Sequence, residues 1–436
     1  MHASRPNLAH SDRYSLLEMA AESRDAASSL PSRPTAGRCP SCGSPLLLRF
    51  LDLRDLPIHT STVLSSRSEA VAIPRANLRL DVCKACGLIS NSAFDAPRHD
   101  YSASYEEVQF FSPRFRAYAA ELADQLVERH ALAGRDVFEI GSGRGDFLTE
   151  LVSRTGGRGV AVDPSYRDGD LASEFVGRIS VDKAFFAAEQ VPPNAGAIVC
   201  RHTLEHVHDV ATFVRKVRAG LDRSSGAVAL FEVPDTRPVL EEGAFWDLYY
   251  EHCSYFTPGS LARAFRAAGL VPSRLERTFD DQYIFITAAT GDGGPSEPLP
   301  EEETAAEVVA LAERFSAAFD EARRHWQDRL GAARGRAART VIWGAGSKGV
   351  GFLSMLGVAD EVDYAIDVNP GKQGMFMPGT GHEIASPDRL ADRPPDLVVV
   401  MNPVYVDEIA RDLARRGIET ELVTVAGDST AVAGRS

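Results

Sequence analysis

The 436-residue chain lacks any uninterrupted apolar run that approaches the roughly 20 residues of a membrane span. Residues 1–38 mix Ser, Arg, Ala and Pro, and they contain no continuous apolar segment typical of a secretory signal. We therefore expect residues 1–36 to be a disordered leader with a short helix at 14–23, the alternative being an extra helix docked on the body. A cytoplasmic protein with reduced cysteines follows from these absences.

Positive charge is also scarce, since 47 Lys and Arg residues face 61 Asp and Glu residues and the formal net charge is -14. This balance argues against nucleic acid or an anionic membrane as the main partner. At 44% hydrophobic and 25% charged residues, the composition is that of a globular protein, and its length predicts two to three domains. We expect a small-molecule substrate and a monomer or weak homodimer.

Cysteine is rare, and four of the six cysteines fall into two matched pairs, Cys39-Pro40-Ser41-Cys42-Gly43 and Cys83-Lys84-Ala85-Cys86-Gly87. Each pair forms a knuckle whose turn points two thiolates at one ion. Four thiolates leave no open position for water, so the sequence predicts a structural Zn²⁺ site; a redox dithiol is the alternative. Cys200 and Cys253 are expected to be buried small apolar residues.

The richest motif is residues 138–148, in which an apolar strand enters a glycine turn and a helix follows. We call residues 141–145 the first glycine turn. A second apolar run, 159–162, ends at Asp163. Glycines allow a ligand to approach the backbone, and an acid after the next strand can bind both ribose hydroxyls, so this unit predicts nucleotide binding. An NAD-type or empty unit is the alternative.

Glu139 and the Gly-x-Gly-x-Gly spacing resemble motif I of the class I S-adenosylmethionine (SAM) methyltransferases. The resemblance implies that the glycines pass under the amino-acid end of SAM and that Glu139 lies beside the positive sulfonium. The cofactor contacts that it implies are Glu139, Gly141, Ser142, Gly143, Asp163, Pro164, Asp182, Arg201 and His202.

The rest of the chain predicts an α/β protein. Short strands are expected at 50–53 and 78–82, and a helix from 112 to about 133. A methyltransferase sheet is predicted from strands at 136–140, 159–163, 178–181, 196–200, 227–232, 270–276 and 282–289. The last two flank a turn at Asp280 and Asp281 and are expected to pair in antiparallel fashion.

A linker rich in Gly, Pro and Glu at 291–303 leads into a predicted amphipathic helix from about 302 to 334. Strand 340–343 then enters the Gly-x-Gly-x-x-Gly of residues 344–349, the second glycine turn, and strand 362–366 ends at Asp367. This indicates a second Rossmann-like unit. We favour a substrate-phosphate or purely architectural role for it over NAD binding, which would need more strands.

The predicted domains are therefore a class I SAM methyltransferase Rossmann-like domain flanked by a small N-terminal zinc-binding module and a C-terminal Rossmann-like domain. Their expected bounds are 1–36 for the leader, 37–104 for the zinc module, 105–290 for the methyltransferase domain, 291–337 for the linker and long helix, and 338–430 for the C-terminal domain.

Two histidine-rich segments follow the cofactor motifs: 200–209, after the fourth strand, and 245–260. The whole of residues 37–428 resembles the three-domain sugar C-methyltransferases that act on nucleotide-linked keto-deoxysugars. The resemblance rests on the cysteine pairs, on the segment 249–256, and on Lys372-Gln373-Gly374 with Pro378-Gly379. It implies that His252 is the general base, with Glu251 and Tyr249 ordering substrate and charge, and a histidine that titrates near pH 7 suits proton removal next to a carbonyl.

Other roles stay open for several of these residues. His206 is equally a catalytic candidate and a helix-start residue, and His252 has a structural alternative in a hydrogen-bond network with its Glu and Tyr neighbours. The resemblance places a tyrosine over the active site, either Tyr101 or Tyr105, with structural packing as the alternative.

The family commonly has Tyr-His-Glu-His where this chain has residues 249–252, and a Trp-Asn pair where it has Met401-Asn402. The acceptor is therefore open, and an oxygen or nitrogen nucleophile is the alternative to carbon. The lower alternatives are a non-catalytic zinc-containing scaffold and an oxidoreductase that uses the second glycine turn.

Overall fold

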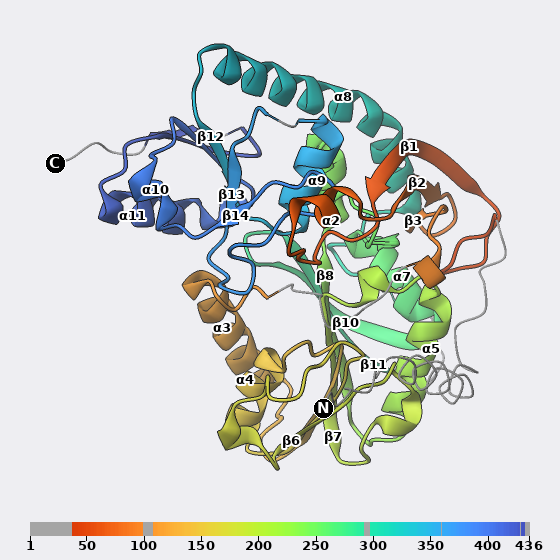
Figure 1. Cartoon of the computed structure of the whole chain (residues 1–436). Coiled ribbons are helices and arrows are strands. Elements are labelled where there is room, and N and C mark those ends of the chain that lie inside the picture. The colour runs from red at the N-terminus through yellow and green to blue at the C-terminus, as the bar shows by residue number, and fades with distance from the viewer. Residues whose placement is uncertain (1–36, 99–107, 292–296, 359, 428, 432–436) are drawn as a thin grey trace, which may run out of the picture. The chain divides into compact units, whose positions relative to one another are not determined.

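The computed structural model describes residues 37–98, 108–291, 297–358, 360–427 and 429–431 (Figure 1). The predicted leader and both Tyr101 and Tyr105 lie outside these residues. Residues 36–436 belong to one compact unit, and the described part of this unit builds three sheets.

A four-stranded antiparallel sheet carries the cysteine module. Its strands, in spatial order, are β1 (Leu47–Pro57), β2 (Arg75–Cys83), β3 (Ile89–Asn91) and β9 (Ser254–Tyr255), and helix α2 (Arg67–Val71) lies between β1 and β2 in sequence. The fourth strand, β9, comes from the second histidine-rich segment, far downstream. Backbone pairing therefore ties the cysteine module directly to the segment that holds the predicted catalytic residues.

The central sheet has seven strands, all parallel except β11. Their spatial order is β10 (Leu270–Thr278), β11 (Tyr283–Thr290), β8 (Val228–Pro234), β7 (Ala195–Arg201), β4 (Asp136–Ile140), β5 (Gly159–Val162) and β6 (Ile179–Asp182). All seven strands expected from the sequence are confirmed, including the antiparallel pair β10–β11. The carboxyl ends of β4, β5, β7 and β8 meet at one edge, where open α/β sheets bind ligands.

Helices cover both faces of this sheet because buried strands alternate their side chains. Val137 packs with helices α3 (Pro113–Arg129) and α4 (Asp146–Thr155), whereas the next residue, Phe138, packs with α5 (Val210–Leu221) and α7 (Pro258–Ala267). Ser112 caps α3 by accepting a hydrogen bond from the Phe115 amide, which explains why this helix begins where the sequence predicts.

The C-terminal sheet has six strands. In spatial order these are β14 (Ile384–Ala385), β13 (Tyr364–Ile366), β12 (Thr340–Trp343), β15 (Leu397–Val400), β16 (Glu421–Thr424) and β17 (Ser429–Ala431), of which only β17 is antiparallel to its neighbour. Helices α9 (Ser347–Leu356), α10 (Arg389–Asp392) and α11 (Val406–Arg416) complete this domain. It is Rossmann-like, as the second glycine turn predicts.

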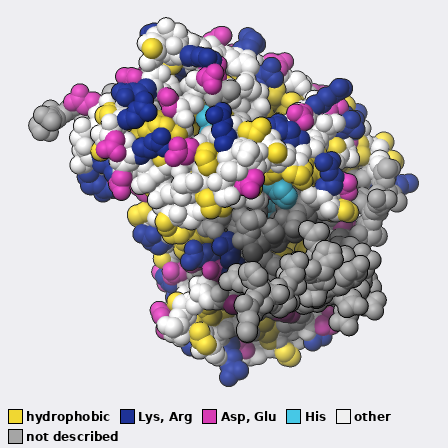
Figure 2. Space-filling model, in the orientation of Figure 1, with side chains coloured by type: hydrophobic (Ala, Val, Ile, Leu, Met, Phe, Trp, Pro, Cys, Tyr) yellow, Lys and Arg dark blue, Asp and Glu magenta, His cyan; other side chains and the backbone are white. Residues whose placement is uncertain are grey.

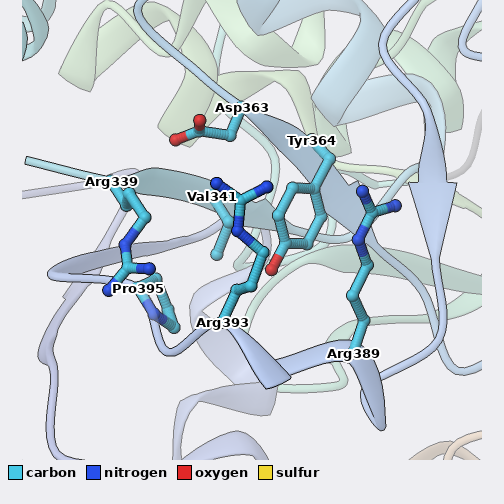
Figure 3. Close-up of a pocket in the computed structure, with 7 residues that line it drawn as sticks. All are labelled: Arg339, Val341, Asp363, Tyr364, Arg389, Arg393 and Pro395. Carbon is cyan, nitrogen blue, oxygen red and sulfur yellow. The ribbon is translucent and has the colours of Figure 1, made fainter. Parts of the chain in front are cut away.

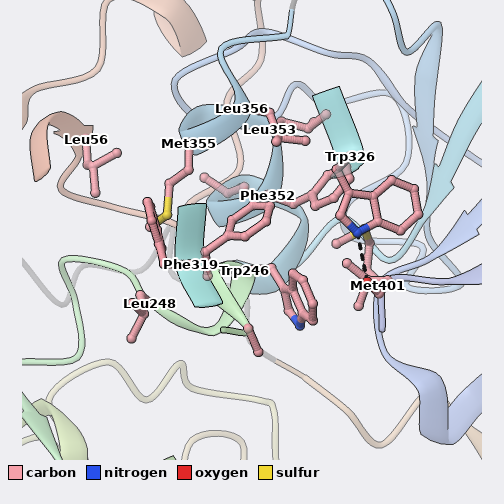
Figure 4. Packing of buried hydrophobic residues seen from close by; sticks show 14 of the residues in the cluster. Leu56, Trp246, Leu248, Phe319, Trp326, Phe352, Leu353, Met355, Leu356 and Met401 are labelled. Carbon is pink, nitrogen blue, oxygen red and sulfur yellow. Dashed lines mark hydrogen bonds between the residues drawn. The ribbon is translucent and has the colours of Figure 1, made fainter. Parts of the chain in front are cut away.

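One long helix, α8 (Ala305–Gly335), packs against both the cysteine module and the C-terminal domain (Figure 1). Its apolar stripe confirms the prediction from sequence, since Phe315 stacks edge-on against Phe50 of β1 at 5.8 Å between ring centroids. Further along, Trp326 is buried against Phe352 of α9, and its indole donates a hydrogen bond of 2.9 Å to the Val425 carbonyl (Figure 4). A single core cluster therefore joins the N-terminal and C-terminal sheets.

The cysteine module and the C-terminal domain also contact each other through the backbone. The Gly379 amide donates to the Ala70 carbonyl of α2 at 2.8 Å, and the Arg75 guanidinium donates to the Gly379 carbonyl at 2.6 Å. The Phe376 amide donates to the Leu64 carbonyl at 2.9 Å. The Pro378-Gly379 element that contributed to the family resemblance is thus a docking loop.

On the visible face, basic and acidic side chains are interspersed (Figure 2). Within the described ranges, every helix is too short or too polar to cross a membrane.

Candidate active site

The first glycine turn connects β4 to α4 in the left-handed backbone conformation, with φ of 72° at Gly141, 53° at Gly143 and 83° at Gly145. A Cβ atom on Gly141 would lie 2.0 Å from the Thr203 hydroxyl, so a side chain has no room there. The Gly143 amide donates to the Asp163 carboxylate at 2.7 Å. The acid after β5 therefore holds the turn in shape.

Three polar atoms in or beside this turn are buried and have no hydrogen-bond partner among the described residues: Glu139 Oε2, Ser142 Oγ and Arg144 Nε. Glu139 is 3% exposed, and burial raises the pKa of its carboxyl to about 8, although Arg201 opposes the shift. A buried acid without a partner is costly, and a positively charged ligand group would satisfy it. The first glycine turn therefore fits the cationic cofactor that the sequence implies.

The other expected cofactor residues lie around the same sheet edge. Asp182 ends β6 and accepts a hydrogen bond of 3.2 Å from the Gln190 amide group, and Pro164 follows Asp163 on the surface. Arg201 ends β7 and His202 follows it, but the side chains of both turn toward Glu232 of β8. They therefore contact the neighbouring strand at the carboxyl edge of the sheet.

Glu232 is the main residue that the sequence interpretation did not assign. Its fully buried carboxylate accepts two hydrogen bonds from Arg201, at 2.7 and 3.0 Å, and one from Tyr118, while the His202 ring nitrogen lies 2.9 Å away. Burial alone would raise the pKa of Glu232, yet Arg201 and His202 outweigh burial and hold this pKa at about 2. The sequence did offer a signal for this pair, because Glu232 lies near the end of β8 and Arg201 ends the neighbouring strand β7.

The two histidine-rich segments meet at the cleft. The rings of His206 and His252 stand perpendicular, with centroids 4.8 Å apart, and the Tyr249 ring lies 4.3 Å from that of His252. Burial, followed by the proximity of His206, lowers the pKa of His252 well below its usual range. His252 is therefore a neutral imidazole at pH 7, the form that accepts a proton.

His206 is held by the backbone next to His252, since its Nδ1 lies 3.1 Å from the Glu251 carbonyl oxygen. A carbonyl oxygen only accepts hydrogen bonds, so a neutral His206 carries its proton on Nδ1. Ligand atoms of Glu205, His206 and His252 lie within 4.8 Å of one another, a spacing that a metal ion would also accept. Burial raises the pKa of Glu205 to about 8.

Glu251 points away from this pair, into the junction of the three sheets. Its carboxylate accepts hydrogen bonds from the Thr60 amide at 2.8 Å, from the Thr60 hydroxyl at 2.9 Å and from the Ser61 hydroxyl at 3.3 Å. Both hydroxyls also lie 3.0 Å from the Ser347 hydroxyl at the start of α9. Of the four predicted catalytic residues, Glu251 is thus the one whose side chain organises the surrounding loops.

A cleft of about 780 Å³ opens in front of His252. His202, His206 and Tyr249 line it from the central domain. The second glycine turn lines it from the C-terminal domain, together with Lys348, Asp367 and Lys372. Within the turn, the Ala345 amide donates to Asp367 at 3.0 Å, and Lys348 pairs with Asp247. Both glycine turns therefore use an acid after the next strand to hold their backbone.

The four paired cysteines converge as their spacing predicts. Their sulfur atoms all lie within 4.8 Å of one another, with 3.5 Å between Cys39 and Cys86 and 3.6 Å between Cys42 and Cys83. A zinc ion with Zn–S bonds of about 2.3 Å places its sulfurs roughly 3.8 Å apart, so the cluster fits this ion. Cys200 and Cys253 are buried elsewhere, as expected.

Comparison with known proteins gives two family matches. A methyltransferase domain model matches residues 110–273, and a C-methyltransferase C-terminal domain model matches residues 297–424. The curated protein C-methyltransferase NovU from Streptomyces niveus is 26% identical over 387 residues, which cover 85% of this chain and 90% of NovU.

Solved structures resemble a smaller part of the chain. The 1,6-didemethyltoxoflavin-N1-methyltransferase of Burkholderia thailandensis is 19% identical, covers 41% of this chain and 82% of its own, and has a TM-score of 0.34. A putative sarcosine dimethylglycine methyltransferase of Galdieria sulphuraria is 10% identical, covers 45% and 96% respectively, and has a TM-score of 0.34.

The Glu232 network predicts a pH-dependent stability. Because the pKa of Glu232 falls from its ordinary 4.5 to about 2, its ionised carboxylate contributes stability above pH 4.5, and this contribution is lost as the pH falls toward 2. We expect Glu232→Gln to lower the free energy of unfolding at pH 7 by about 3–5 kcal/mol, because Arg201 loses its buried partner. Urea denaturation of the wild type and of Glu232→Gln at pH 7 and at pH 3 measures this. The difference in unfolding free energy between the two proteins should be smaller at pH 3. An equal difference at both pH values would contradict a lowered pKa for Glu232.

Proposed function

We propose that this chain is a SAM-dependent C-methyltransferase that methylates a carbon next to a carbonyl group in a nucleotide-linked keto sugar. The matches to a methyltransferase domain, to a C-methyltransferase C-terminal domain and to C-methyltransferase NovU support the methyltransferase part of this proposal. The observation that carries the proposal is the neutral, buried His252 at a cleft lined on its other side by the second glycine turn.

The proposed chemistry follows from the residues that line the cleft. The His252 imidazole removes a proton from the carbon next to the carbonyl, and the electron pair of that bond forms an enolate. SAM, held at the first glycine turn, would supply the electrophilic methyl group to the enolate carbon, and the bond between this methyl group and the sulfur would break to leave neutral S-adenosylhomocysteine. The abstracted proton stays on His252. Placement of substrate and cofactor in line accounts for much of the rate.

The enolate oxygen needs a hydrogen-bond donor, and Tyr249 is our candidate. His206 uses its Nδ1 proton toward the Glu251 carbonyl, so in the neutral form its other ring nitrogen is an acceptor. The Tyr249 ring contacts the His252 ring and lines the cleft, which puts a hydroxyl donor on the base's own side. We assign to His206 the role of orienting His252, and to Glu251 the role of positioning the segment that carries His252.

The acceptor class rests on the C-terminal side of the cleft. The second glycine turn leads into the N-terminus of α9, a helix end that favours anions. The buried Lys372 adds a cation there, and Lys348 adds a second one that is paired with Asp247. A nucleotide diphosphate matches this lining, and the sugar that it carries would extend toward His252.

Two resident groups complete the proposal. SAM would occupy the first glycine turn, with Glu139 and Ser142 supplying the buried polar atoms that need partners. The sulfurs of Cys39, Cys42, Cys83 and Cys86 would bind one structural zinc ion.

Replacement of His252 tests the mechanism. We expect His252→Asn to reduce turnover at least about 100-fold, because proton removal loses its base, while the affinity for S-adenosylhomocysteine stays unchanged. The wild-type enzyme should wash deuterium from D₂O into a keto sugar nucleotide without SAM, and the variant should not. His325→Asn, on the exposed side of α8, is the matched control. Methylation by the wild type without such exchange would assign the nucleophile to oxygen or nitrogen instead.

The raised pKa of Glu139 predicts that SAM binding is coupled to the release of a proton from this carboxyl. Its pKa of about 8 leaves the carboxyl mostly protonated at pH 7, and a neighbouring sulfonium would favour ionisation. SAM binding should therefore release up to one proton at pH 7, and its affinity should rise with pH up to about 8. Calorimetry in buffers of different ionisation enthalpy measures this release. S-adenosylhomocysteine, which has no sulfonium charge, should release less, and Glu139→Gln should abolish the difference between the two ligands.

The metal proposal predicts one zinc ion per chain by mass spectrometry of the purified protein. Cys42→Ser removes one of four ligands, so we expect loss of zinc and a lower midpoint of thermal unfolding. Cys200→Ser changes a buried cysteine outside the cluster and should retain the metal. Wild-type protein that carries no zinc after expression in zinc-supplemented medium would refute this part of the proposal.

A further inference from the structure

A second, smaller pocket lies in the C-terminal domain, at the opposite end of β12 from the second glycine turn. It has a volume of about 90 Å³, and its polar lining consists of Arg339, Asp363, Tyr364, Arg389 and Arg393 (Figure 3). Arg339 directly precedes β12 and Tyr364 begins β13, so both sit at the amino ends of these strands. The pocket is therefore separate from the cleft at the carboxyl ends.

The Tyr364 hydroxyl is an unsatisfied donor in this pocket. Tyr364 is 7% exposed, and its oxygen is buried with no hydrogen-bond partner among the described residues. In Figure 3 the ring lies between the Arg389 and Arg393 side chains, and the Arg389 guanidinium is 4.5 Å from the ring centroid. A buried hydroxyl without an acceptor costs free energy, and a ligand oxygen would satisfy it.

Positive charge in the pocket is only partly neutralised. Arg389 pairs with Glu383 at 2.7 Å, whereas Arg339 is 4.0 Å from Asp396. Within the described part of the chain, no acidic group forms an ion pair with Arg393, whose side chain is exposed. The Asp363 carboxylate accepts a hydrogen bond from the Thr340 amide at 3.0 Å. The lining itself thus holds three guanidinium groups and one carboxylate, while the partners of Arg389 and Arg339, Glu383 and Asp396, lie outside the lining.

We propose that this pocket binds a small oxyanion of the phosphate class, either inorganic phosphate or the phosphoryl group of a monoester. Guanidinium groups present forked donors that match phosphate oxygens, and the tyrosine hydroxyl donates to a further oxygen. The volume admits a group of this size, whereas pockets for nucleotide-sized ligands measure several hundred Å³. This site is independent of the substrate cleft.

Calorimetric titration of the full-length protein with inorganic phosphate, at constant ionic strength set with NaCl, tests the proposal. We expect saturable binding to the wild type and an affinity at least about tenfold lower for Arg393→Ala, because one charge-assisted contact is lost. Tyr364→Phe keeps the ring, removes only the hydroxyl and should also weaken binding. Circular dichroism and the thermal midpoint without phosphate verify that each variant is folded.

Two controls separate this pocket from other anion sites. Arg415→Ala removes an exposed arginine of α11 that lies outside the pocket, and it should not change phosphate affinity. Glucose 6-phosphate serves as the monoester. If it binds more tightly than inorganic phosphate, the pocket binds a phosphoryl group on a larger molecule. If it binds more weakly, the ligand of the pocket is free inorganic phosphate. Absence of binding by both at tens of millimolar, or binding that Arg393→Ala leaves intact, overturns the proposal.

Discussion

The site depends on one buried carboxylate. Glu251 is completely buried, and a buried charge persists only when hydrogen bonds replace its water. Those hydrogen bonds come from Thr60 and Ser61, which follow β1 of the cysteine module, and the Ser347 hydroxyl at the start of α9 joins the same network. Because Glu251, the Thr60–Ser61 pair and Ser347 come from three different parts of the chain, the network holds these parts together behind His252.

The cysteine module and α8 support this junction from outside. The sulfur atoms of the two knuckles converge, and strand β9 completes the module's sheet from the segment that carries His252. Helix α8 packs its aromatic stripe against β1 on one side and against α9 on the other. Both elements of this network, the segment after β1 that donates to Glu251 and helix α9 that carries Ser347, are therefore anchored in one core. The two histidines can keep a fixed geometry although they come from loops.

Local patterns predicted most of the fold and the conformation of the first glycine turn. The seven strands of the central sheet appear at the expected positions because each buried strand is a short apolar run bounded by turns. The first glycine turn could also be predicted, because its positive φ angles favour glycine over residues with a side chain. The acid after β5 contacts the backbone of this turn. The Glu251 network and the role of Glu232 were not foreseen. Thr60 carries no periodicity or spacing that marks it, and Arg201 was expected at the cofactor rather than beside Glu232.

The sequence by itself determined which segments form strands, helices, glycine turns and cysteine knuckles, since these follow from interactions between residues close together in the chain. The tertiary structure alone decided which side of the site each side chain faces. It turned Glu251 toward Thr60 and His252 toward His206, and it brought the second glycine turn to the same cleft. The physical reason is that burial and hydrogen-bond satisfaction depend on partners that are distant in sequence, and only the packed core selects them.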